Sequence, residues 1–132
     1  MKIAISATVG NLDAMIDPRF GRCPYFVILD SDTLQFEVIS NAALNAGGGA
    51  GIQAAQVVAS KGVKMLITGN VGPHAFQALS ATGIKVVTGA FGTVREVVEK
   101  YKRGELKETG APTVRGHFGT GGGQGSGWRR VR

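Results

Sequence analysis

Positions 65–74 read MLITGNVGPH and join a buried strand to a helix within one short stretch. Three apolar residues followed by Thr68 predict the strand at 65–68, and the glycines that follow predict a turn. Pro73 suits the first position of a helix, where a missing N–H is tolerated. The helix continues in the apolar spacing of Phe76 and Leu79. A strand that passes directly into a helix is the repeating unit of an α/β fold.

Elements of the same two kinds lie on either side of this stretch. Apolar residues three positions apart, at Ile52, Ala55 and Val58, predict a helix before it with these side chains on its buried face. Residues 84–88 predict a further strand after it. The second half of the chain therefore alternates between helix and strand, which indicates parallel strands joined by right-handed crossovers.

The last predicted helix carries the clearest signals of the chain. Its apolar residues stand at positions 94, 97, 98 and 101, the spacing of one helical face. Thr93 and Glu96 form a capping-box pattern at its start, and Gly104 predicts its end.

The first forty residues alternate as strands do. Lys2–Ala7 and Tyr25–Asp30 are short apolar runs, and residues 34–38 alternate apolar and polar side chains after a hairpin-turn signal at 31–33. We therefore expect an α/β fold with a five-strand mixed sheet, in which strand 2 is antiparallel and helices cover both faces. Ligands of such sheets gather at the carboxyl ends of the parallel strands, which the topology assigns to residues 8–24, 41–51 and 69–74.

Composition limits the kind of protein that this chain can be. Its 132 residues, of which 43% are hydrophobic, suit one domain with one core. No apolar run reaches the length of a membrane span and the start does not read as a signal peptide, so we expect a cytoplasmic protein that does not associate with membranes. One cysteine cannot form an internal disulfide or supply the four thiolates of an ordinary iron-sulfur cluster.

The loop that enters the second strand concentrates reactive side chains. Residues 17–26 read DPRFGRCPYF, with Arg19 and Arg22 close to Cys23. The two guanidinium groups are expected to attract an anion and to lower the pKa of the Cys23 thiol, which we expect to be accessible. The alternative is that Cys23 is a small buried side chain and that Asp17 pairs with an arginine to fix the loop.

Two predicted helix starts offer further contacts for an anion. Gly49 and Gly51 belong to a glycine-rich helix start, where unpaired N–H groups suit phosphate or a sulfide-bearing cluster. Asn70 and Gly72 precede the other helix, and His74 lies in its first turn. The helix dipole there disfavours a cation, so His74 is either a neutral imidazole available as a ligand or an exposed bystander.

The sequence lacks the patterns of common enzymes. It has no Ser-His-Asp set, no H-E-x-x-H, no phosphate-binding Walker pattern and no paired acids suited to glycoside hydrolysis. No acidic residue follows the glycines at the distance that a dinucleotide site requires. These patterns favour a protein that is not an enzyme.

Three segments together resemble the nitrogenase iron-molybdenum cofactor biosynthesis family: DPRFGRCPYF at 17–26, GAGIQAAQV at 49–57 and ITGNVGPHAFQAL at 67–79. The resemblance covers the domain at residues 1–104. It implies a three-layer α/β/α sandwich similar to ribonuclease H and a role in carrying or assembling iron-sulfur or iron-molybdenum clusters. It also implies that Arg22, Cys23 and His74 contact a cluster, with Cys23 and His74 as its metal ligands.

We therefore expect a carrier, scaffold or storage protein for an iron-sulfur or thioferrate-like cluster, with cluster donor and acceptor proteins and a second copy of the chain as candidate partners. The glycine-rich basic tail at 105–132 is expected to be disordered, since it carries five basic and two acidic residues and little apolar surface. One alternative is nucleic-acid binding, in which Trp128 stacks on a base and the arginines after it contact phosphates. Another is a small-anion binding or sensing domain.

Overall fold

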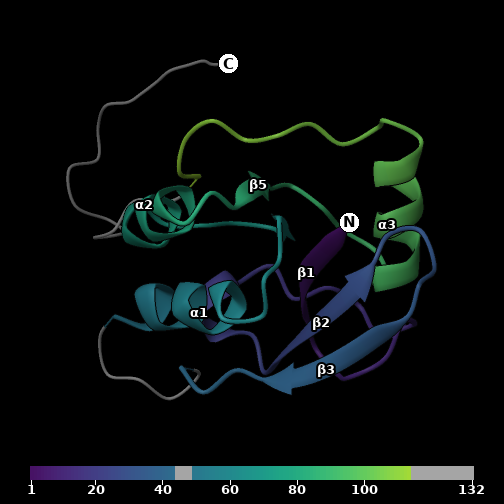
Figure 1. Cartoon of the computed structure of the whole chain (residues 1–132), viewed down its shortest axis with the longest axis horizontal. Helices are drawn as coiled ribbons and strands as arrows, with labels where there is room; N and C mark the ends of the chain where they lie inside the picture. The colour runs from purple at the N-terminus through teal and green to yellow at the C-terminus, as the bar shows by residue number, and fades with distance from the viewer. Residues whose placement is uncertain (44–48, 114–132) are drawn as a thin grey trace.

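The computed structural model describes residues 1–43 and 49–113, which form a five-stranded sheet with helices on both faces (Figure 1). The strands are β1 (Lys2–Ala7), β2 (Tyr25–Asp30), β3 (Phe36–Ser40), β4 (Met65–Ile67) and β5 (Lys85–Val87). Their order across the sheet is β3-β2-β1-β4-β5. β1, β4 and β5 are parallel, and β2 is antiparallel to both of its neighbours. The expected mixed sheet with an antiparallel second strand is confirmed.

The helices divide the core into two parts. They are α1 (Ala50–Ala59), α2 (Pro73–Ala81) and α3 (Val94–Lys102), with a short 3₁₀ helix, η1 (Phe20–Arg22), before β2. Phe26 and Ile28 point to the face that α1 and α2 cover, whereas Val27 and Leu29 point to the face that α3 covers. This alternation follows from the two-residue period of a strand.

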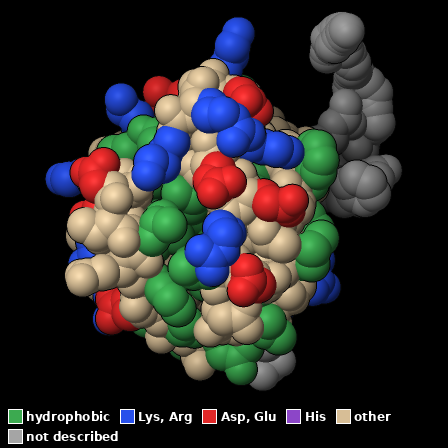
Figure 2. Space-filling model, turned by 90° about the vertical axis from the view of Figure 1, so that its right-hand side faces the viewer, with side chains coloured by type: hydrophobic (Ala, Val, Ile, Leu, Met, Phe, Trp, Pro, Cys, Tyr) green, Lys and Arg blue, Asp and Glu red, His purple; other side chains and the backbone are tan. Residues whose placement is uncertain are grey.

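The ends of α3 are as the sequence predicted. The Thr93 side chain accepts a hydrogen bond from the Glu96 backbone N–H (3.1 Å), and the Glu96 carboxylate accepts one from the Thr93 N–H (2.8 Å). Gly104 follows the helix with a φ of 76°, a left-handed conformation that favours glycine. Around α3 the surface carries charges of both signs with apolar patches between them (Figure 2). Two arginines there are paired: Arg95 with Asp13 and Arg103 with Glu105.

The buried face of α1 differs from the expected one. Ile52 is 39% exposed, and the buried residues of the helix are Ala50, Ala54, Ala55 and Val58. The cause is a close approach of α1 to α2, because a Cβ added at Gly51 would lie 2.9 Å from the Cβ of Ala75. Only small side chains fit between helices at this separation.

The chain after α3 also departs from expectation. Residues 105–113, part of the expected tail, form an extended segment that we call the C-terminal strap. Thr109 donates its N–H to the Val86 carbonyl (2.6 Å), and its Oγ1 accepts the N–H of Thr88 (3.0 Å). The strap is therefore held to the domain at Thr109, although the sequence analysis placed its residues in the tail. Residues 114–132, which hold the rest of the predicted tail, lie outside the described residues.

Within the described ranges, no helix combines the length and the apolar character needed to cross a bilayer.

Candidate functional site

Three loops meet in a cavity of about 480 Å³ beside the first turns of α1 and α2. Its walls are residues 18–22, 49–52 and 70–75. The loops come from the three segments that the topology assigned to the carboxyl ends of the parallel strands. Seven of the eight candidate residues line the cavity: Arg19, Arg22, Gly49, Gly51, Asn70, Gly72 and His74. We call this cavity the helix-start pocket.

Two helices begin at the helix-start pocket. Gly49 precedes α1 in the left-handed conformation (φ 72°), and Gly72 precedes α2 with Pro73 at the first helical position. Among the described residues, no side chain accepts a capping hydrogen bond from either helix start. The first N–H groups of a helix have no partner within it, and they carry the positive end of its dipole. Both helix starts therefore present donors to an anion in the pocket.

Glycines allow the pocket walls to approach one another. In addition to the Gly51 contact with Ala75, a Cβ at Gly21 would lie 3.1 Å from the Gly51 nitrogen. A Cβ at Gly69 would lie 2.6 Å from the Pro18 Cα. Gly21 and Gly69 face backbone atoms, and Gly51 faces the Ala75 Cβ, so a larger side chain at any of the three would crowd its neighbour. The packing against Ala75 is therefore enough to explain why position 51 is glycine, whether or not its N–H binds a ligand.

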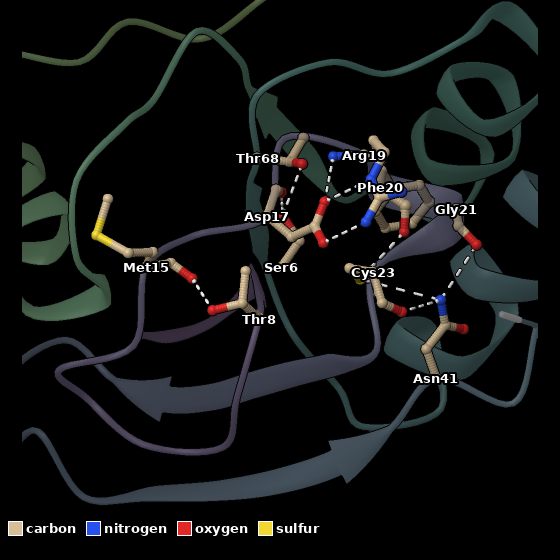
Figure 3. Close-up of polar contacts among 10 residues, drawn as sticks. All are labelled: Ser6, Thr8, Met15, Asp17, Arg19, Phe20, Gly21, Cys23, Asn41 and Thr68. Carbon is tan, nitrogen blue, oxygen red and sulfur yellow. Dashed lines mark hydrogen bonds and ion pairs between the residues drawn. The ribbon is translucent and has the colours of Figure 1, made fainter.

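Arg19 is held at the pocket by the buried carboxylate of Asp17 (Figure 3). The guanidinium Nε lies 3.0 Å from Oδ1 and the terminal nitrogen 2.9 Å from Oδ2, and the Arg19 backbone N–H also donates to Oδ1 (2.9 Å). Burial by itself would raise the pKa of Asp17, but the hydrogen bonds and positive charge of Arg19 outweigh it and lower that pKa. Asp17 therefore stays ionised and pairs with Arg19 at neutral pH.

Further polar contacts fix this loop to the sheet. Ser6 Oγ donates to the Asp17 carbonyl (2.6 Å) and lies 2.7 Å from Thr68 Oγ1. The Asn70 N–H donates to the Pro18 carbonyl (2.8 Å), so the loop that precedes α2 runs beside the loop that carries Arg19. The ends of β1 and β4 thus position one wall of the pocket.

Cys23 does not line the helix-start pocket. It is fully buried, and its Sγ donates to the Phe20 carbonyl (3.3 Å). Burial, with a smaller contribution from the negative charge of Asp17, raises the pKa of the Cys23 thiol to about 12. The prediction of an accessible thiol with a lowered pKa is therefore wrong, because the nearby arginine is paired with Asp17 and solvent does not reach the sulfur. The alternative interpretation, a small buried side chain beside an Asp17–Arg19 pair, agrees with the structure.

Asn41 is a buried polar residue of this region that the sequence analysis missed. Its Nδ2 donates to the carbonyls of Cys23 (2.8 Å) and Gly21 (3.2 Å), and its Oδ1 accepts the Ala43 N–H (3.0 Å). It thus ties η1 to the end of β3 (Figure 3). A polar residue directly after a strand was the only available signal, and many turns share it.

His74 and Arg22 are exposed on the pocket walls. His74 is the second residue of α2. The sequence analysis paired it with Cys23 as a metal ligand, but His74 lines the pocket whereas Cys23 is buried and does not. Across residues 1–43 and 49–113, no three His, Cys, Asp or Glu side chains gather closely enough to hold a metal ion.

A family model described as dinitrogenase iron-molybdenum cofactor matches residues 1–104. The chain belongs to this family. Among solved structures, the apo form of the orange protein from Desulfovibrio gigas is 44% identical, with a TM-score of 0.83 over 85% of this chain and 95% of that one. A Thermotoga protein assigned to NifB and to the DUF35 family is 38% identical, with a TM-score of 0.71 over 81% of this chain and 91% of that one.

A further relative also matches most of this chain. An uncharacterized protein of Methanocaldococcus jannaschii is 31% identical over 111 residues, which are 82% of this chain and 91% of that protein.

Proposed function

We propose that the helix-start pocket binds a compact anionic metal-sulfur cluster and that the protein carries or stores this cluster without catalysing a reaction on it. The observation that carries the proposal is the charge of the pocket. Among the described residues its lining includes Arg22, His74 and Arg19, which pairs with Asp17 behind it, but no carboxylate, and two uncapped helix starts add donors. Such a site favours an anion over a cation or a neutral molecule.

The shortage of metal ligands narrows the class of anion. Among the described lining residues, only His74 has a side chain that commonly binds transition metals, and Cys23 is buried away from the pocket. A bare metal ion would therefore find too few ligands among the described residues. An anion that brings its own sulfide ligands needs hydrogen-bond donors and positive charge, which this pocket supplies.

The size of the pocket and the family agree with this class of ligand. A volume of about 480 Å³ lies within the range of small-molecule sites. The description of the family names the dinitrogenase iron-molybdenum cofactor. The solved structure of the orange protein is an apo form, which means a form without its bound group. The proposal keeps two expectations from the sequence analysis. One is a fold similar to that of ribonuclease H, and the other is that separate proteins donate the cluster to this chain and accept it from this chain.

Anaerobic titration with tetrathiomolybdate tests the proposal, because this metal-sulfide dianion can be followed by its visible absorption. We expect one saturable site per chain. Arg22→Gln should weaken binding about fivefold or more, because it removes one charge from the pocket. Arg95→Gln is the matched control, since it removes the same charge from the α3 face. An equal effect of both variants, or the absence of saturable binding, contradicts the proposal.

Competition with phosphate and sulfate distinguishes a site for a metal-sulfur cluster from a site that binds small anions in general. Displacement of tetrathiomolybdate by equimolar phosphate would favour the general anion domain. The nucleic-acid alternative rests on residues 128–132, which lie outside the described residues, and it stays a prediction from sequence.

A further inference from the structure

The C-terminal strap is fastened to one wall of the helix-start pocket. Thr113 donates its N–H to the Val71 carbonyl (2.8 Å), and its Oγ1 accepts the Val71 N–H (2.8 Å) and lies 3.2 Å from the same carbonyl. Val71 and its neighbours Asn70 and Gly72 line the pocket, whereas the strap does not. The strap therefore holds this wall from outside the pocket, and Figure 1 shows the described part of the chain ending beside α2.

The backbone N–H groups of these three lining residues differ in their partners. The Asn70 N–H donates to the loop before η1 (2.8 Å), and the Val71 N–H donates to Thr113. Among the described residues, the Gly72 N–H has no acceptor. Gly72 therefore supplies the one backbone donor of the three that remains for a ligand.

The contact with the strap also sets the direction of this donor. The peptide that joins Val71 to Gly72 is trans, like every peptide of the described chain. A trans peptide is planar, and its C=O and N–H point in opposite directions. Because Thr113 binds the carbonyl of this peptide, the Gly72 N–H points away from the strap.

We propose that Thr113 is a positioning residue of the helix-start pocket, which aims the Gly72 N–H at the bound anion. This inference rests on the proposed function of the pocket. Val71 is 2% exposed, so water does not replace the Thr113 hydroxyl as the acceptor of its N–H. An unpaired buried N–H is costly. Loss of the hydroxyl would therefore shift the loop and turn the Gly72 donor away from the anion.

Binding of the anion and fastening of the strap are then linked in both directions. If the fastened strap raises the affinity for the anion by some factor, the bound anion must stabilise the fastening by the same factor. We expect this factor to be about five. A bound anion should therefore protect the Val71 N–H, which is the group that the strap holds.

A matched set of variants of the full chain tests the proposal, with tetrathiomolybdate as the probe. Thr113→Val should raise the dissociation constant about fivefold, whereas Thr113→Ser keeps the hydroxyl and should stay within about twofold of wild type. Thr82→Val is the control, because it removes a hydroxyl that donates to the Leu79 carbonyl at the other end of α2. An unchanged dissociation constant for Thr113→Val, or an equal rise for Thr82→Val, would overturn the proposal.

Amide NMR supplies a readout that a loss of stability alone would not move. In wild type, saturating tetrathiomolybdate should shift the Gly72 amide signal and slow the hydrogen exchange of the Val71 N–H about fivefold. The Gly62 amide, beyond the far end of α1, is the internal control and should not respond. In Thr113→Val the shift of the Gly72 signal should be smaller. A Gly72 signal that does not respond to bound tetrathiomolybdate would overturn the proposal.

A ligand-free measurement separates failure of this inference from failure of the proposed function. Without an anion, the Val71 N–H of Thr113→Val should exchange about tenfold faster than that of wild type, and the Gly62 N–H should exchange at the wild-type rate. Saturable binding without this faster exchange would overturn the further inference alone. Faster exchange without saturable binding in wild type would overturn the proposed function and, with it, the role of Thr113.

Discussion

At the scale of single residues, Asp17 is the buried anchor of the pocket. Asp17→Asn should lower the free energy of unfolding by about 1–3 kcal/mol at pH 7, because a 3% exposed carboxylate loses its charged hydrogen bonds to Arg19. Chemical denaturation of both proteins measures the difference. Equal stability at pH 7 would contradict the anchoring role.

The same pair makes a prediction about pH. The folded pKa of Asp17 lies below its ordinary value, so its stabilising contribution is present above the unfolded pKa, near 4, and is lost as pH falls through the folded pKa. The stability difference between wild type and Asp17→Asn should therefore shrink as the pH falls below about 4. Other carboxylates titrate in both proteins and cancel in the comparison. A difference that grows toward low pH would contradict the direction of the shift.

Cys23 makes the opposite kind of prediction, because its thiol is protonated and buried. Native protein at pH 8 should resist alkylation by iodoacetamide, and protein unfolded in guanidinium should react at once. Cys23→Ala should bind tetrathiomolybdate within about twofold of wild type, whereas His74→Ala should bind more weakly. Rapid alkylation of the folded chain would show that the sulfur is reachable.

At the scale of elements, the pocket depends on the close contact of α1 with α2. Gly51→Ala places a Cβ 2.9 Å from that of Ala75, and it should destabilise the fold by about 1–3 kcal/mol because backbone must move. Ala75→Gly in the same chain opens the space again. The double variant should therefore lose less stability than the two single changes added together. Thermal and chemical denaturation of the four proteins form the required cycle, and strict additivity would contradict the contact.

The elements themselves could be predicted from sequence because their signals are local. The capping box of α3 and Pro73 at the start of α2 are read from neighbouring residues, and the two-residue period of the strands needs no knowledge of partners. Ile52 was misplaced because its exposure depends on how closely another helix approaches. The separation of α1 and α2 depends on the small side chain of Ala75 in α2, so the residue spacing within α1 does not reveal it.

The candidate site was predictable in position but not in every contact. Seven of eight residues line the pocket because topology alone brings the ends of parallel strands together. Cys23 was misjudged because adjacency to two arginines does not reveal whether a side chain points outward or into the core. The strap could not be predicted from sequence because its hydrogen bonds join residues far apart in the chain, such as Thr113 and Val71.

At the scale of the whole molecule, the strap belongs to the folded domain. Removal of residues 114–132 should leave the melting temperature nearly unchanged. Removal of residues 105–132 should lower stability by about 2 kcal/mol or more, because β5 and the loop before α2 lose hydrogen bonds to Thr109 and Thr113. Thermal melts of the two truncated proteins compare the segments directly. Equal stability of the two would show that the strap contributes nothing to folding.

The strap also makes the two borders of the sheet unequal. At β5 it binds Val86 and Thr88, the residues that face away from β4, whereas within the described chain β3 pairs only with β2. An uncovered border strand is a template on which another strand can add. The described part of each molecule therefore offers one such template, not two. Strand addition between identical copies would end with a closed pair and could not propagate into a fibre, since the far border of each copy is already occupied by its own chain.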